Sequence, residues 1–143
     1  IAVSFIYIIF INYLYMIFKS SSIQYFLLAC IPSRIILSIL PLYLSEKYLF
    51  YYGFLLLAIA SSFLFLYFTN KRLNADEGGG NTWWANFRLI HGLLYLCAAI
   101  YSIQGKKIAS IPLLVDTFIG LKLFIFHRYL QTNKILNSMK IIF

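Results

Sequence analysis

A run of 21 residues without a charged side chain, from Tyr48 to Phe68, constrains this chain more than any other feature of its sequence. About 20 apolar residues in a helix cross the hydrocarbon core of a bilayer, which is roughly 30 Å thick. The whole chain is 62% hydrophobic and 11% charged, whereas a soluble domain carries about 25% charged residues. The sequence therefore excludes a water-soluble globule and predicts an integral membrane protein.

The same length criterion predicts an all-α fold, a polytopic bundle of five transmembrane helices that forms one domain over residues 1–128. The spans are expected at 1–18, 23–44, 48–68, 83–103 and 108–126. The first run has no basic segment before it and no small-residue cleavage site after it, so we expect a retained span. The second contains Pro32 and Pro41, which predict kinks because proline lacks a backbone N–H.

The last segment, 129–143, has a different pattern. Its apolar residues recur at helical spacing and its polar residues fall on the opposite face. The apolar set is Ile135, Leu136, Met139, Ile142 and Phe143, and the polar set is Lys134, Asn137, Ser138 and Lys140. This pattern predicts an amphipathic helix that lies in the headgroup layer.

The positions of Lys and Arg at the ends of the spans predict the orientation of the protein in the membrane. Six lie on one side, namely Lys19, Lys71, Arg72, Arg128, Lys134 and Lys140, and three on the other, namely Lys47, Lys106 and Lys107. The side with six charges is expected to be cytoplasmic or its equivalent. Trp83 and Trp84 then lie at that interface as anchors, where amphipathic indoles are enriched.

Two charged residues inside the predicted spans form a candidate ion pair. At 1.5 Å per residue, Arg34 lies about 16 Å from one end of its span and Asp116 about 12 Å from the opposite end of its own. The two residues therefore share a similar depth, where an unpaired charge costs at least ~2.5 kcal/mol. We expect a buried pair that fixes helix register; an ion or proton path, or a clamp for an anionic substrate, is the functional alternative.

A polar stripe is expected on the span 83–103, where Arg88, His91, Tyr95 and Ser102 recur at steps that place them on one helix face. Small residues, Ala98 and Ala99, lie on the same side. Such a stripe either packs closely against a neighbouring helix, with polar groups bonded across the seam, or lines a cavity.

No motif indicates a catalytic, cofactor or metal site, so we expect no enzymatic activity, no cofactor and no bound metal. His91 and His127 fall at different depths and do not form a haem pair. The glycine run 78–80 lacks the Lys-Ser/Thr of a phosphate loop. Cys30 and Cys97 both lie in apolar stretches, without the spacing of a disulfide framework or a zinc site. The formal charge of +8 is accounted for by the ends of the spans, so no nucleic-acid partner is expected.

The stretch from Gly79 to Tyr95 reads Gly-Gly-Asn-Thr-Trp-Trp-Ala-Asn-Phe-Arg-Leu-Ile-His-Gly-Leu-Leu-Tyr, and Tyr-Phe-Thr-Asn-Lys-Arg at 67–72 precedes it. This block resembles small uncharacterised multi-pass membrane proteins encoded by large DNA viruses. The resemblance covers about residues 23–103 and rests on the spacing of the Trp-Trp pair, Asn, Arg and His. It implies a viral or infected-cell membrane and no activity. The abundance of Ile, Phe and Tyr also suits a small subunit of an organellar respiratory assembly, so an organellar inner membrane is the alternative.

Two functions from different classes follow from these features. The first is a structural or docking subunit of a membrane assembly or virion membrane, with the lipid bilayer and other membrane subunits as its partners. The second is a small oligomeric transporter or channel that uses Arg34, Asp116, Arg88 and His91. A membrane-embedded enzyme ranks third, because no catalytic motif is present.

Overall fold

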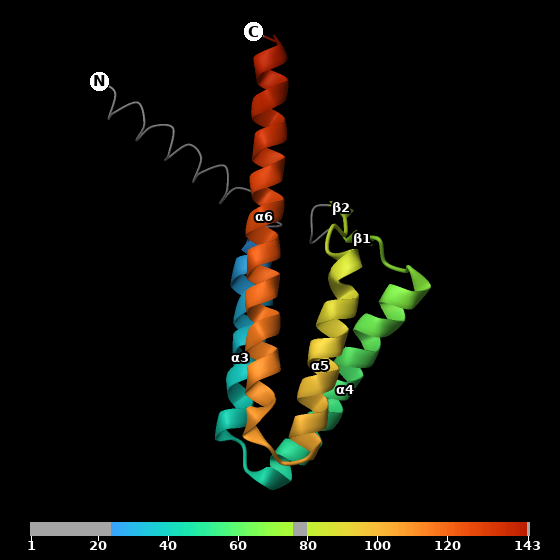
Figure 1. Ribbon diagram of the computed structural model, residues 1–143, viewed down its shortest axis with the longest axis vertical. Coiled ribbons are helices and arrows are strands. Elements are labelled where there is room, and N and C mark those ends of the chain that lie inside the picture. Colours follow the sequence, from blue (N-terminus) through green and yellow to red (C-terminus); the bar gives the residue numbers. More distant parts are fainter. Residues whose placement is uncertain (1–23, 76–79, 143) are drawn as a thin grey trace, which may run out of the picture.

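The computed structural model describes residues 24–75 and 80–142, and they are almost entirely helical (Figure 1). The longer helical elements are η1, a π-helical turn (Phe26–Cys30), α3 (Ile31–Tyr43), α4 (Glu46–Thr69), α5 (Arg88–Ile103) and α6 (Ser110–Ile142). Short 3-10 turns, η3 (Ala85–Phe87) and η4 (Lys107–Ala109), precede α5 and α6. In the loop after α4, β1 (Asn74–Ala75) pairs antiparallel with β2 (Gly80–Asn81).

Four helical segments in this part of the chain are long and apolar enough to span a membrane. They are Phe26–Tyr43, Glu46–Thr69, Ala85–Ile103 and Lys107–Lys134. They correspond to the second to fifth predicted spans, so the all-α class is confirmed. The first predicted span, 1–18, lies outside the described residues, and the count of five stays a prediction.

Helix α6 continues without a break past Phe126, the predicted end of the last span, to Ile142, and the end of the span itself stays a prediction. The segment predicted as a separate tail therefore extends the axis of α6 (Figure 1). The prediction relied on a change in composition and not on a helix-stop signal. After Gly120 the chain contains no glycine or proline, and its Leu, Gln and Lys residues favour helix. The placement of this segment in the headgroup layer stays a prediction.

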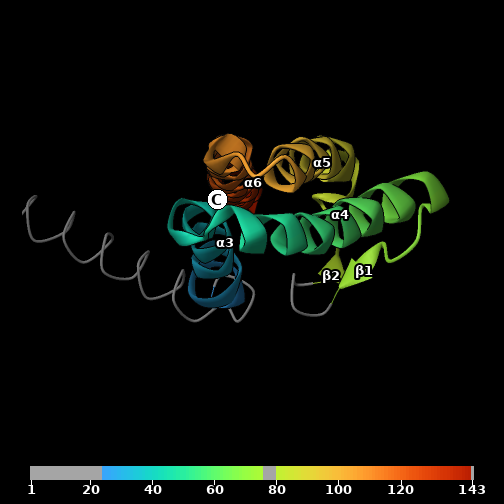
Figure 2. The same ribbon diagram turned by 90° about the horizontal axis from the view of Figure 1, so that it is seen from below.

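The helices form two pairs. Helix α3 packs on α6, α4 packs on α5, and α5 joins the pairs through its contacts with α6. In the end-on view of Figure 2, α6 lies beside α3 and α5 beside α4. The pairs meet at the lower end of Figure 1 and diverge toward the upper end, where the loop after α4 and the end of α6 both lie.

Small residues bring α4 and α5 close together. A Cβ atom on Gly53 would lie 2.9 Å from the backbone nitrogen of Ile103, and one on Gly92 would lie 2.9 Å from the side chain of Leu64. Ala60, Ala98 and Ala99 are fully buried in the same seam. Close approach through small residues is the usual way in which membrane helices associate, since lipid supplies no hydrophobic driving force between them.

The two prolines of the second predicted span change the hydrogen bonding around them. Before Pro32 the chain forms η1, in which the N–H of Ile31 bonds the carbonyl of Phe26. Pro41 has no N–H to offer the carbonyl of Leu37, and Tyr52 Oη of α4 donates to that carbonyl instead, at 2.7 Å. The bond satisfies a backbone group that water cannot reach inside lipid and ties α4 to α3.

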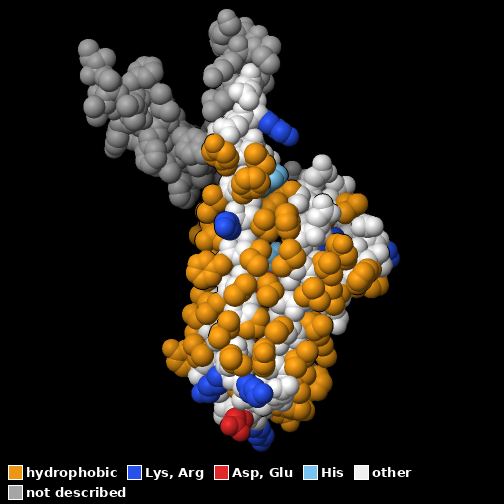
Figure 3. All heavy atoms as spheres, viewed as in Figure 1, with side chains coloured by type: hydrophobic (Ala, Val, Ile, Leu, Met, Phe, Trp, Pro, Cys, Tyr) orange, Lys and Arg blue, Asp and Glu red, His pale blue; other side chains and the backbone are white. Residues whose placement is uncertain are grey.

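The surface is apolar over the height of the bundle. Figure 3 shows hydrophobic side chains over most of this face, with Lys, Arg and acidic side chains together at the lower end and further Lys and Arg side chains, separate from one another, higher up. Large exposed apolar residues occur on every candidate span, for example Leu28, Phe54, Leu93 and Phe118. A belt of this kind is expected where lipid is the solvent.

Candidate functional site

The structure brings Arg34 and Asp116 together in the middle of the bundle. Nη1 of Arg34 donates to Oδ2 of Asp116 at 2.7 Å. The aspartate side chain is 0% exposed, whereas the arginine side chain keeps 16% of its exposure. Both residues lie within about 9 to 14 Å of the lower ends of their helices, which agrees with the shared depth expected from the sequence.

His91 is a third member of this cluster. Its Nδ1 contacts Oδ1 of Asp116, the carboxylate oxygen that Arg34 does not bind, and lies 3.4 Å from Nη1 of Arg34. Because a carboxylate oxygen only accepts, this hydrogen bond requires Nδ1 of His91 to donate, and Nδ1 then does not accept from Arg34 as well. Since the residues come from α3, α5 and α6, this cluster links the two helix pairs.

Gly120 makes room for the arginine. A Cβ atom at this position would lie 3.1 Å from Nη1 of Arg34 and 3.9 Å from Cε1 of His91. Gly120 follows Asp116 by four residues on α6 and so shares its helix face. The absence of a side chain there lets the guanidinium lie flat against α6.

The other residues of the predicted polar stripe make separate contacts. Arg88, 3% exposed, donates through Nη1 to the carbonyl of Lys71 and through Nη2 to the carbonyl of Arg72, both at 2.7 Å. The backbone at Asn70 and Arg72 is left-handed, with φ of 48° and 53°. Arg88 therefore fixes the loop that follows α4 against the start of α5.

Lower on α5, the stripe is a packing seam. Ser102 Oγ donates to the carbonyl of Leu49 on α4 at 2.9 Å. Tyr95 is buried, and its ring centroid lies 5.7 Å from that of Phe63 on α4. His91 is thus the stripe residue that reaches the ion pair, and the others hold α5 to α4 and its loop.

Aromatic side chains pack between the helices at the upper end. Trp83 stacks on His127 of α6, with ring centroids 4.4 Å apart and planes 7° from parallel, and meets Trp84 edge-on at 5.5 Å. Phe26 of η1 stacks on Phe124 of α6 at 4.0 Å. Trp83 therefore joins the loop before α5 to α6, and the role of both indoles as interface anchors stays a prediction.

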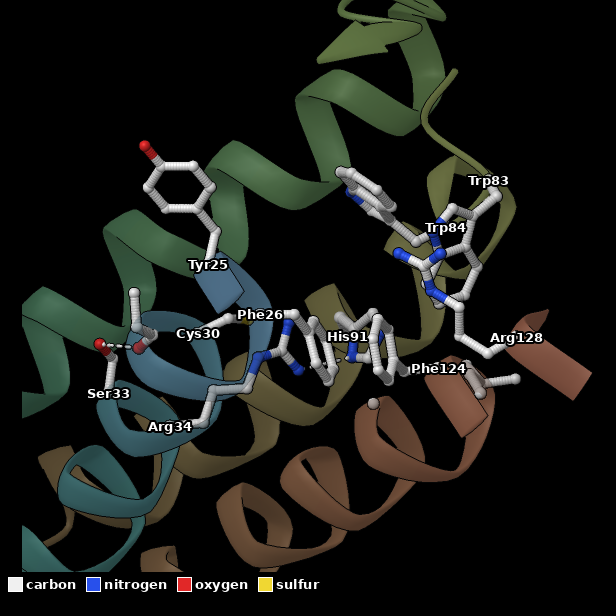
Figure 4. A pocket seen from close by; sticks show the side chains of 13 residues that line it. Tyr25, Phe26, Cys30, Ser33, Arg34, Trp83, Trp84, His91, Phe124 and Arg128 are labelled. Carbon is white, nitrogen blue, oxygen red and sulfur yellow. Dashed lines mark hydrogen bonds between the residues drawn. The ribbon is translucent and has the colours of Figure 1, made fainter. Parts of the chain in front are cut away.

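A cavity of about 430 Å³ lies between η1, α5 and α6. Its basic side chains are Arg34, His91 and Arg128, and its aromatic walls include Phe26, Trp84 and Phe124. Figure 4 shows Arg34 and Arg128 extending from opposite sides, with His91 and Phe124 between them. Arg128 also lies over the Phe124 ring, 5.5 Å from its centroid. None of the described lining residues is acidic.

A comparison of the chain with protein-family models, curated proteins and solved structures finds no match. Within residues 24–75 and 80–142, no three His, Cys, Asp or Glu side chains are grouped so that they could hold a metal ion.

Sequence reasoning missed the roles of Tyr52 and Arg128, although each left a signal. Pro41 frees the carbonyl four residues before it, so a donor from a neighbouring helix is expected there. Gly120, Phe124 and Arg128 follow Asp116 at four-residue steps, which places them on a stripe that turns by about 40° per step around α6.

Proposed function

We propose that the protein is an integral membrane protein that acts as a structural or docking subunit of a membrane assembly or virion membrane. The observation that carries the proposal is that its intramembrane polar groups bind one another and the backbone of the same chain. Arg34, Asp116 and His91 form one closed cluster between three helices. Arg88 and Ser102 donate hydrogen bonds to backbone carbonyls of α4 and of the loop that follows it.

A rigid interior supports a docking role more than transport. A conducting path needs polar groups that face water along the whole depth of the membrane. Below the buried cluster, α5 instead presents Tyr95, Ala98, Ala99 and Ser102 to α4 in a close seam, and each is nearly or fully buried. Interaction with other subunits then falls to the exposed apolar faces, and the lipid bilayer is the remaining partner.

The location follows from the sequence block and from the charge distribution. The resemblance around Trp83, Trp84, Arg88 and His91 supports a viral or infected-cell membrane, with an organellar inner membrane as the alternative. The end of the bundle that carries the loop after α4 and the end of α6 is the more positive one, so we assign it to the cytoplasmic side or its equivalent.

A small oligomeric transporter or channel is the second candidate. The cavity favours it, because Arg34 and His91 of the buried cluster both line that space. In this alternative His91 is the proton relay or pH gate, since imidazole is the side chain that changes charge near neutral pH.

Two measurements separate the candidates. Photo-crosslinkers at Phe54 and Phe118, both exposed at mid-span, are expected to give discrete adducts with another membrane protein in the native membrane. Adducts with lipid alone at both positions would contradict the docking role. Purified protein in liposomes with ion- and proton-sensitive dyes is expected to show no flux. Flux that His91→Ala abolishes, with the amount of folded protein unchanged, would replace the first function by the second.

A further inference from the structure

The geometry of the cavity between η1, α5 and α6 points to a ligand, and we propose that it binds a single-chain anionic amphiphile of the fatty-acid or lysophosphate type. The anionic group lies at Arg128 and the indoles, and the chain runs down along Phe26, Ala29 and Leu123 toward the buried cluster. This binding site is separate from any docking surface, so it can exist whether or not the protein has a protein partner.

The charge of the lining selects an anion. Arg34 and Arg128 reach the cavity from α3 and α6, His91 reaches it from α5, and the described lining contains no carboxylate. Asp116 compensates Arg34 from behind, out of the lining. The hydrogen bond that holds Arg34 in the cluster is the one that its Nη1 donates to Oδ2 of Asp116. The described lining is therefore positive overall, and Arg128 carries that charge at the upper end, away from the Arg34–Asp116 pair.

The rest of the lining is mostly apolar and favours a ligand with an apolar chain. Phe26 and Phe124 are stacked on each other, and Trp83 and Trp84 cover the upper part. Ligand sites are typically apolar spaces of about 300–1,000 Å³ with a few polar groups, and this cavity of about 430 Å³ lies at the small end of that range. A cavity of this volume accommodates one acyl chain.

The height of the cavity in the bundle gives the orientation of the ligand. Arg128 lies about 27 Å above Ser110, the first residue of α6, which is the height of a headgroup layer if the lower end of the bundle lies at the opposite interface. Gly120, beside Arg34, lies about 12 Å below Arg128. An anionic head at Arg128 thus remains near water, and a chain of medium length ends above the paired charges.

The two tryptophans of the chain, Trp83 and Trp84, both line the cavity and report on its occupancy. We would titrate the protein in neutral detergent with a medium-chain fatty acid brominated beside its carboxylate, and with the matching brominated alcohol. The acid is expected to quench the fluorescence saturably at a concentration about tenfold below the alcohol, the size of one charge-assisted hydrogen bond. An acid brominated at the chain end should quench less; stronger quenching by this probe would overturn the orientation.

Three variants test the site. Arg128→Gln should bring the acid to the potency of the alcohol, whereas Lys122→Gln, which removes the same charge from α6 outside this cavity, should leave the tenfold preference unchanged. Ala29→Phe fills the cavity without altering charge and should abolish saturable quenching by both probes. Equal potency of acid and alcohol, or an unchanged preference in Arg128→Gln, would overturn the proposal. Complete displacement by millimolar inorganic phosphate would also overturn it, in favour of a free-anion site.

Discussion

Removal of one charge from the buried Arg34–Asp116 pair should destabilise the protein strongly, and removal of both should cost much less than the sum. The Asp116 side chain is fully buried, and the Arg34 side chain is 16% exposed, on the side that faces the cavity. Breaking a buried pair on one side typically costs about 3–5 kcal/mol, because an uncompensated charge remains. Asp116→Asn should lie near 3 kcal/mol, since Arg34 keeps partial access to the cavity. Arg34→Leu should lie toward 5 kcal/mol, since the stranded carboxylate has no such access.

The double variant Arg34→Leu/Asp116→Leu decides whether the two residues interact. Unfolding is followed by the helical circular dichroism of the protein in mixed micelles with increasing fractions of a denaturing detergent. A coupling free energy of about 2 kcal/mol or more is expected, within the range for residues in direct contact. Thr117→Val, next to Asp116, is the matched control, because it removes a neutral bond to the carbonyl of Leu113 and should cost about 1 kcal/mol or less. If the loss of unfolding free energy in the double variant equals the sum of the losses in the two single variants, the buried pair is refuted.

Two further predictions concern side chains that donate hydrogen bonds to backbone carbonyls. Tyr52→Phe leaves the carbonyl of Leu37 without its donor and should lower the free energy of unfolding by about 1–3 kcal/mol in the same assay; an unchanged value would mean that the carbonyl has another partner. Arg88→Ala removes two donors to the loop after α4, so hydrogen exchange and protease cleavage near Lys71 should rise while helix content stays the same. Protection equal to that of the parent protein would contradict this role.

The positions of four long apolar helices and the similar height of Arg34 and Asp116 could be predicted from the sequence, because both follow from one-dimensional quantities. The length of an apolar run gives the span, and the rise of 1.5 Å per residue gives the depth of each charge. Arg34 and Asp116 face each other at the heights that this arithmetic assigns.

The third member of the cluster could not be predicted in the same way. His91 reaches Asp116 because α5 packs between α4 and α6 and is rotated so that this side chain faces α6. Helix neighbours and rotation depend on packing of the small residues in the α4–α5 seam, and the periodicity of α5 alone gives only a common face. The cavity could not be predicted either, because its lining comes from segments as far apart as Phe26 and Arg128.

The length of α6 shows a different limit. Composition changes sharply after Phe126, from apolar to mixed, but helical hydrogen bonding depends on the backbone and continues wherever no residue interrupts it. The residue at which a helix leaves the lipid and the residue at which the helix ends can differ, and hydropathy predicts only the first.

A bundle that crosses the membrane with the α4–α5 loop and the end of α6 on one side predicts a definite pattern of cysteine accessibility. With Cys30 and Cys97 replaced by alanine, single cysteines at Asn74, Asn137 and Lys106, all exposed, would be labelled in sealed vesicles by a membrane-impermeant reagent. Asn74→Cys and Asn137→Cys should react from the same side and Lys106→Cys from the opposite one. Labelling of the first two positions from opposite sides, or of all three from one side, would contradict the membrane-spanning arrangement.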